Sequence, residues 1–197
     1  MPTLIQSGSS DNVRRSASLS RCGRYRWWLR RSFGRPGSGR VVCFLMLNPS
    51  TADHRRDDPT IRRCMGFARA WGYSILEVRN LFAWRATDPR ELLTAPDPTG
   101  SRRGDRELRA VLDADLVVAA WGAWVPYARD RDALALLAGR RLMCLGQTRN
   151  CRPRHPLYVG GSTRLEVFDG YAESASRLTD TAPSGTPVTG LGSRAGR

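Results

Sequence analysis

The alternation of apolar and polar positions divides the middle of the chain into short strands and amphipathic helices. Four apolar runs, at residues 41–47, 74–82, 114–120 and 141–145, are continuous and short, which is typical of strands buried on both faces. An aromatic and basic run at residues 24–33 predicts one more strand before them. We expect it to form an antiparallel pair with the strand at 41–47, through a turn at residues 34–39.

Helical patterns fill the intervals between these strands. Asp58 and Pro59 are a typical N-cap and first helical residue, apolar side chains recur at helical spacing from residue 61 to 71, and Gly72 ends the pattern. A short helical turn is expected at Asp88-Pro89, and helices at residues 104–113 and 133–138, the latter with a start near residue 125. This order predicts a three-layer α/β fold, with a mainly parallel central sheet flanked by helices.

Composition limits the fold to one domain with polar ends. Residues 1–20 are Ser-rich and lack periodicity, and residues 173–197 are rich in Gly, Pro, Ser and Thr. We therefore expect a disordered arm (1–20), a single α/β domain (21–172) and a disordered tail (173–197). No apolar run approaches the ~20 residues of a membrane helix, and the N-terminus lacks the apolar segment of a secretory signal. We expect a monomer that does not bind a membrane.

Cysteine usage indicates a reducing compartment. The chain has five Cys, an odd number, with no C-x-x-C pair, and Cys43 and Cys144 lie within apolar runs. These features predict reduced core thiols and a cytoplasmic protein. The two histidines are too few for a multi-histidine metal site, and the Cys spacings match no zinc or iron–sulfur pattern. We expect no metal and no other cofactor.

The formal charge of +14 comes entirely from arginine, because the chain contains no lysine. Coding bias in a GC-rich genome explains Arg in place of Lys, but not the excess of Arg over Asp and Glu. The charge therefore predicts a polyanionic partner, either nucleic acid, with DNA favoured, or a nucleotide. The absence of lysine excludes chemistry through a lysine Schiff base.

Polar side chains follow the apolar runs and would gather at one edge of a parallel sheet. Asn48-Pro49-Ser50 follows the first run, Asn80 lies near the end of the second, and Trp121-Gly122 follows the third. His155 lies in a second polar turn at residues 153–158, between two prolines that restrict the backbone. Together they predict a pocket of two amides, hydroxyls and an imidazole, which suits the edge of a base.

Each of these residues also has a structural interpretation. An Asn-Pro after a strand is often only a turn, and a histidine beside proline often has a packing role. Asn80 would cap a loop, and the aspartates at positions 53, 57 and 58 would serve only local pairing with arginine and helix capping. The functional interpretation depends on the group as a whole.

Several motifs carry a resemblance to known families. M-L-N-P-S-T-A-D (46–53), D-D-P-T-I-R-R-C (57–64), N-L-F-A-W-R-A-T-D-P (80–89) and R-H-P-L-Y (154–158) look like a bacterial family of unknown function, DUF1643. More distantly, the chain resembles the uracil-DNA glycosylase superfamily. M-L-N-P-S is similar to its G-x-[DN]-P-[YG] motif, H-P-L to its H-P-S motif, and Asn80 falls where its base-reading Asn lies.

The resemblance implies a role for each residue. Asn48 would place the attacking water, His155 would donate a hydrogen bond to the departing base, and Asn80 would select the base. Pro49 and Ser50 would bind the substrate. An aromatic side chain that stacks on the base is expected among Trp84, Trp121 and Tyr158. The candidates for phosphate contacts are Arg62, Arg63 and Arg154.

The motifs depart from the superfamily pattern at three positions. Met46 replaces a glycine, and Leu157 replaces a serine that contacts phosphate. Asn48 replaces the carboxylate of the most active forms, and an amide orients water without acting as a base. The resemblance implies a glycosylase-like hydrolase acting on a base in nucleic acid. The alternatives are a non-catalytic nucleic-acid-binding module of the same fold and an enzyme on free modified nucleotides.

Overall fold

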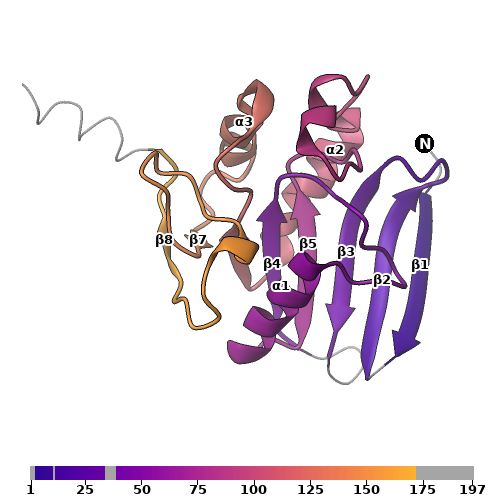
Figure 1. Ribbon diagram of the computed structural model, residues 1–197, viewed down its shortest axis with the longest axis horizontal. Helices are drawn as coiled ribbons and strands as arrows, with labels where there is room; N and C mark the ends of the chain where they lie inside the picture. Colours follow the sequence, from indigo (N-terminus) through magenta and orange to yellow (C-terminus); the bar gives the residue numbers. More distant parts are fainter. Residues whose placement is uncertain (1–2, 11, 34–38, 172–197) are drawn as a thin grey trace, which may run out of the picture.

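Strand β4 (Val41–Met46) lies in the interior of the sheet because both of its faces are apolar. Val42, Phe44 and Met46 belong to one core cluster, whereas Cys43 and Leu45 belong to the other. The predicted burial of this run on both faces is therefore confirmed. The computed structural model describes residues 3–10, 12–33 and 39–171, and their eight strands run in the order β1-β2-β3-β5-β4-β6-β7-β8 (Figure 1).

The four predicted apolar strands form the parallel part of the sheet. β5 (Ile75–Asn80) and β6 (Leu116–Ala119) flank β4, and β7 (Leu142–Cys144) follows β6. In the parallel registers Met46 pairs with Asn80, and Ala119 pairs with both Leu45 and Cys144. The carboxyl ends of these strands therefore lie at one edge of the sheet, as the sequence predicts.

The sheet as a whole is mixed, so the prediction of a mainly parallel sheet is wrong. β1 (Thr3–Ser10), β2 (Val13–Ser20) and β3 (Arg26–Ser32) extend it antiparallel beyond β5, and β8 (Glu166–Phe168) pairs antiparallel with β7. The predicted hairpin between β3 and β4 is also wrong, because β3 pairs with β5. Arg30 lies opposite Glu77 in that pair, a favourable cross-strand charge pairing that local sequence does not reveal.

The N-terminal segment is not the disordered arm that its composition predicts. Residues 3–10 and 13–20 form β1 and β2, so the folded domain begins before residue 21. Val13, Ala17 and Leu19 are buried, and the ladder with β3 supplies main-chain hydrogen bonds that the Ser-rich composition cannot reveal. The predicted tail at 173–197 lies outside the described residues.

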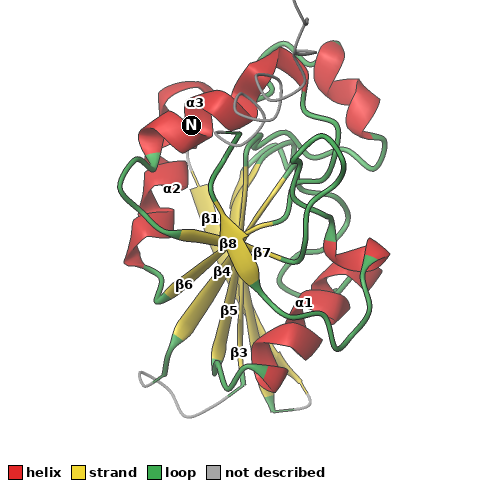
Figure 2. Ribbon diagram, turned by 90° about the vertical axis from the view of Figure 1, so that its left-hand side faces the viewer, coloured by secondary structure: helices red, strands yellow, loops and turns green. Residues whose placement is uncertain are grey.

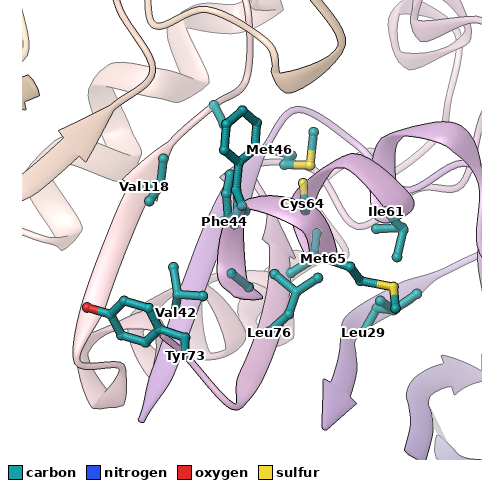
Figure 3. Close-up of a cluster of buried hydrophobic side chains, with 14 of the residues drawn as sticks. Leu29, Val42, Phe44, Met46, Ile61, Cys64, Met65, Tyr73, Leu76 and Val118 are labelled. Carbon is teal, nitrogen blue, oxygen red and sulfur yellow. The ribbon is translucent and has the colours of Figure 1, made fainter. Parts of the chain in front are cut away.

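Helix α1 (Pro59–Ala70) begins and ends as predicted. Asp58 is its N-cap and accepts a hydrogen bond from Ile61 N–H at 2.8 Å, and Trp71 is the C-cap before Gly72. Its apolar face covers one side of the sheet, and Figure 3 shows Cys64 and Met65 beside the β-strand residues Phe44 and Leu76. This packing holds the N-terminus of α1 near the carboxyl edge.

Helices α2 (Ser101–Arg109) and α3 (Arg129–Leu136) cover the other face, so the helices form two outer layers (Figure 2). The predicted helix at 104–113 is observed as α2 followed by the 3-10 turn η2 (Ala110–Asp113). The predicted start near residue 125 is wrong. Tyr127 and Ala128 have φ of 57° and 51°, which separates the turn η3 (Pro126–Ala128) from α3.

Two further 3-10 turns, η1 (Pro89–Leu93) and η4 (Pro156–Tyr158), follow the Asp88-Pro89 and His155-Pro156 motifs. No helix in the described part of the chain is long and apolar enough to cross a bilayer.

Candidate functional site

A pocket of about 460 Å³ lies at the carboxyl edge of the parallel strands, where the sequence predicts one. The structure brings together six of the predicted site residues in its wall: Asn48, Ser50, Asn80, Trp121, His155 and Tyr158. They come from the turns after β4 and β6, the end of β5, and the η4 turn. The size falls within the usual range of small-molecule sites, roughly 300–1,000 Å³.

Asn48 has a fixed orientation in this wall. Its Nδ2 donates to the carbonyl oxygen of Ala86 at 2.8 Å and to that of Pro49 at 3.0 Å. Two carbonyl acceptors identify this end of the amide as the NH₂ group. Oδ1 therefore remains as an acceptor on a pocket residue, which is the group needed to orient a water molecule.

His155 is held by its own turn. Its Nδ1 accepts a hydrogen bond from Leu157 N–H at 3.3 Å, so a neutral imidazole carries its proton on Nε2. Burial lowers the pKa of His155, and the attraction of Asp58 only partly opposes this. The neutral ring is therefore favoured at neutral pH, with Nε2–H available as a donor.

The turn after β6 fixes the position of the His155 segment. Gly122 N–H donates to Pro153 O at 3.1 Å, and Gly122 has a φ of +88°, a conformation that favours glycine. A β-carbon at Gly122 would lie 3.7 Å from the His155 β-carbon. The backbone at Gly122 thus positions one wall of the pocket against the imidazole.

Asn80 and Arg26 form a hydrogen-bonded pair in the pocket wall. Arg26 Nη2 donates to Asn80 Oδ1 at 3.2 Å, and Arg26 Nη1 donates to Ala52 O at 2.9 Å. Asn80 Nδ2 and Arg26 Nε are buried without a hydrogen-bond partner in the described structure. Burial lowers the pKa of Arg26 to about 9, so the guanidinium is still charged at pH 7.

Asp58 supplies a carboxylate to the pocket. It caps α1 through Oδ1 and also lines the pocket. It favours the charged forms of both Arg26 and His155, so its charge acts on two residues of the pocket. Asn48 has no carboxylate, but Asp58, the N-cap of α1, places one in the same pocket.

Aromatic side chains line the pocket at two depths. The Trp121 ring is 2% exposed and packs edge-on against Phe168, with centroids 5.4 Å apart. Tyr158 and Trp124 are 80% and 41% exposed and also line the pocket. Trp121 is thus part of a rigid wall, whereas Tyr158 and Trp124 offer exposed ring surface for stacking.

Five other candidates lie outside the pocket wall: Pro49, Arg62, Arg63, Trp84 and Arg154. The Pro49 carbonyl holds the Asn48 amide, and Trp84 packs edge-on against Tyr25 at 5.4 Å. Arg62 and Arg63 line a separate hollow of about 240 Å³ on α1. Arg154 is exposed and donates from Nε to Gln147 O at 3.1 Å.

Sequence reasoning missed several pocket residues: Arg26, Asp58, Thr60, Thr87 and Trp124. The D-D-P motif revealed Asp58 only as a helix cap. Nothing in the R-Y-R-W-W run distinguishes Arg26 from the other arginines of β3, because its position depends on the neighbouring strand.

Other hollows lack this combination of groups. A larger one of about 670 Å³ borders α3 and β8 and is lined by arginine, aliphatic and aromatic residues such as Arg131, Leu134 and Phe168. It contains no amide or imidazole side chain, so we assign the site to the pocket with Asn48. No three His, Cys, Asp or Glu side chains cluster as metal ligands within the described ranges.

Comparison with known proteins identifies the family but no activity. A family model described as "Protein of unknown function (DUF1643)" matches residues 26–157, about two thirds of the chain. Searches of curated proteins and of solved structures found no match.

Proposed function

The chain belongs to the DUF1643 family of proteins of unknown function, and from its pocket we propose that it hydrolyses the N-glycosidic bond of a base in nucleic acid. The observation that carries this proposal is the convergence of Asn48, Asn80 and His155 in one pocket. Residues on separate faces of the sheet would have excluded it. The distant resemblance of the N-P-S and H-P-L motifs to uracil-DNA glycosylases supports the same chemistry.

The reaction needs a positioned water and a stabilised leaving group. The water oxygen bonds to C1′ of the sugar while the C1′–N bond breaks and its electron pair leaves with the base. Asn48 Oδ1 accepts a hydrogen bond from the water, and the Asp58 carboxylate takes its proton. The His155 Nε2–H donates to the base anion as its charge develops. The proton that Asp58 took from the water finally passes through solvent to the base, so that Asp58 is again a carboxylate.

The pocket also accounts for binding of a flipped base. Its carboxyl-edge position makes it accessible from the surface, and the exposed rings of Tyr158 and Trp124 can stack on a base at the pocket. The net charge of +14 favours association with a phosphate backbone.

Release of free base tests the proposal directly. Single-stranded and duplex DNA carrying uracil, hypoxanthine or 5-substituted pyrimidines are incubated with the protein, and free base and abasic sites are measured. We expect release by the wild type and a loss of roughly 100-fold or more in Asn48→Ala and His155→Ala. Asn150→Ala and His54→Ala are matched controls, because neither residue lines the pocket. The absence of release from every substrate would overturn the enzymatic proposal for DNA.

A second candidate is a nucleic-acid-binding module without catalysis. The observation that favours it is the identity of Asn48, an amide held by two carbonyl groups where active glycosylases use a carboxylate. In that case binding weakens with salt, no base is released, and His155→Ala leaves the affinity unchanged.

The third candidate, an enzyme on free modified nucleotides, is distinguished by its substrate. Release of base from mononucleotides or nucleosides, but from none of the oligonucleotides, would favour this function.

A further inference from the structure

Arg26 of β3 is a buried arginine without a carboxylate partner among the described residues. It is 3% exposed, and no described Asp or Glu lies within ion-pair distance of it. Three other arginines of the described ranges are buried, and each has such a partner: Arg31 with Asp57 at 2.7 Å, Arg79 with Glu107 at 2.9 Å, and Arg129 with Asp105 at 2.5 Å. Arg26 is therefore an exception to the pattern that the rest of this fold follows.

Arg26 makes two hydrogen bonds, but both acceptors are neutral and do not compensate its charge. Nη1 and Nη2 donate to the Ala52 carbonyl and the Asn80 amide oxygen, which are both neutral. Nε has no partner, and the Nδ2 of the adjacent Asn80 has none either. Two neighbouring pocket residues thus hold unused donors, and donors of this kind require an acceptor.

The surrounding charges do not neutralise Arg26. Asp58 and Asp53 attract it from beyond ion-pair distance, while Arg85 and Arg31 act against its charged form. An isolated buried guanidinium is costly to maintain. A bound anion would supply both the missing charge and the missing acceptors.

We propose that Arg26 and Asn80 form a binding site for an anionic group of the ligand that carries only hydrogen-bond acceptors. The anion has two possible sources with the same chemistry: the phosphate of a nucleotide, or the keto edge of a nucleobase that carries negative charge. The anion site rests on the contacts of Arg26 and Asn80, and only the choice of nucleobase probes rests on the proposed function.

Two pairs of probes distinguish these sources by isothermal titration calorimetry on the full chain at neutral pH. Uridine 5′-monophosphate is compared with uridine, and the anionic pyrimidine barbiturate is compared with neutral uracil. We expect the anionic member of one pair to bind roughly tenfold to 100-fold more tightly, as a charge-assisted hydrogen bond implies. A preference in the first pair assigns the anion to a phosphate, and one in the second pair assigns it to the base.

Substitutions at the two residues decide whether Arg26 causes the preference. Arg26→Gln removes the charge, and Asn80→Asp places a carboxylate where Oδ1 now accepts from Arg26. Both are expected to abolish the preference, and Asn80→Asp is expected to raise the melting temperature because it pairs the buried charge. Arg30→Gln, on the same strand and outside the pocket, is the matched control and keeps the preference.

Two outcomes would overturn the anion site. One is equal affinity for both members of both pairs, and the other is a preference that persists in Asn80→Asp. The second variant decides the question even if Arg26→Gln does not fold. Binding is measured without turnover, so a failure of the glycosidic reaction leaves this test intact.

Discussion

Asn48 donates its side-chain amide to the carbonyl oxygen of Ala86 at 2.8 Å, and this bond joins the turn after β4 to the segment after β5. The second bond of Nδ2, to Pro49 O, completes the use of the NH₂ group. The surroundings of Asn48 therefore require a hydrogen-bond donor at Nδ2, while Oδ1 remains an acceptor. This has a direct consequence for any attempt to introduce a carboxylate there.

Asn48→Asp is expected to lower stability without raising activity. The introduced carboxylate would face two carbonyl oxygens and leave both without their donor, a loss of about 1–3 kcal/mol in the free energy of unfolding at pH 7. Urea denaturation of this variant and of Asn150→Asp, an exposed control, measures the difference. A more active and equally stable variant would show that the turn can rearrange to accept a carboxylate.

Asp58→Asn keeps the N-cap of α1 and removes the carboxylate from the pocket. Asn is as good an N-cap as Asp, so stability should change by less than about 1 kcal/mol. If Asp58 takes the proton of the attacking water, base release should fall by roughly 100-fold or more. Activity and thermal denaturation are measured together. Unchanged activity would restrict Asp58 to its role in α1.

The stability of the protein should depend on pH through His155. Burial lowers the pKa of His155 below its ordinary value of 6.5, so the unfolded chain binds more protons than the folded chain in that range. The stabilising contribution is complete above about pH 6.5 and is lost as the pH falls below it. His155→Gln should therefore lose less stability than the wild type between about pH 7 and pH 5.

Thermal denaturation across this pH range measures the effect, with His54→Gln as the matched histidine control. The control retains His155 and shows whether a change of slope is specific to the His155 substitution. Identical slopes for His155→Gln and the wild type would contradict the lowered pKa.

Tyr158→Ala should weaken binding without affecting the fold. The side chain is 80% exposed, so little packing is lost. A base stacked on the ring is worth about 1–3 kcal/mol, which corresponds to roughly fivefold to 150-fold in affinity. Fluorescence titration with a single-stranded oligonucleotide measures it. Tyr127→Ala is the control, because Tyr127 is also exposed, at 61%, and does not line the pocket.

The two buried arginines of β3 should respond differently to Met. Arg31→Met leaves the partly buried Asp57 carboxylate with Arg15 as its remaining ion-pair partner and should cost about 1–3 kcal/mol. Arg26→Met removes a charge that has no carboxylate partner in the described structure and should change stability by less than about 1 kcal/mol. Urea denaturation with unchanged m-values tests both. Equal losses would mean that the contacts with Ala52 and Asn80 already compensate for the Arg26 charge.

The pocket was predictable where it depends on strand ends. The alternation of apolar runs with helical patterns implies parallel strands, and parallel strands bring Asn48 and Asn80 to the same edge. In the structure Met46 pairs with Asn80, so the ends of β4 and β5 lie side by side at that edge. The Asp58-Pro59 pair likewise specifies the start of α1 by local hydrogen bonding alone.

The pocket was not predictable where it depends on strand order. Arg26 reaches Asn80 because β3 pairs with β5, across 54 residues of sequence. The run at 24–33 predicts a strand but does not identify its neighbour, and the neighbour chosen from chain order was β4. Similarly, the Ser-rich strand β2 acquires its hydrogen bonds from β3, which composition does not reveal.

The family match and the pocket wall span almost the same interval of the chain. Its wall begins at Arg26 and ends at Tyr158, and the family match begins and ends within one residue of these positions. β1, β2 and β8 lie wholly outside that interval. The margins of the sheet at β1, β2 and β8 therefore contribute no residue to the pocket wall.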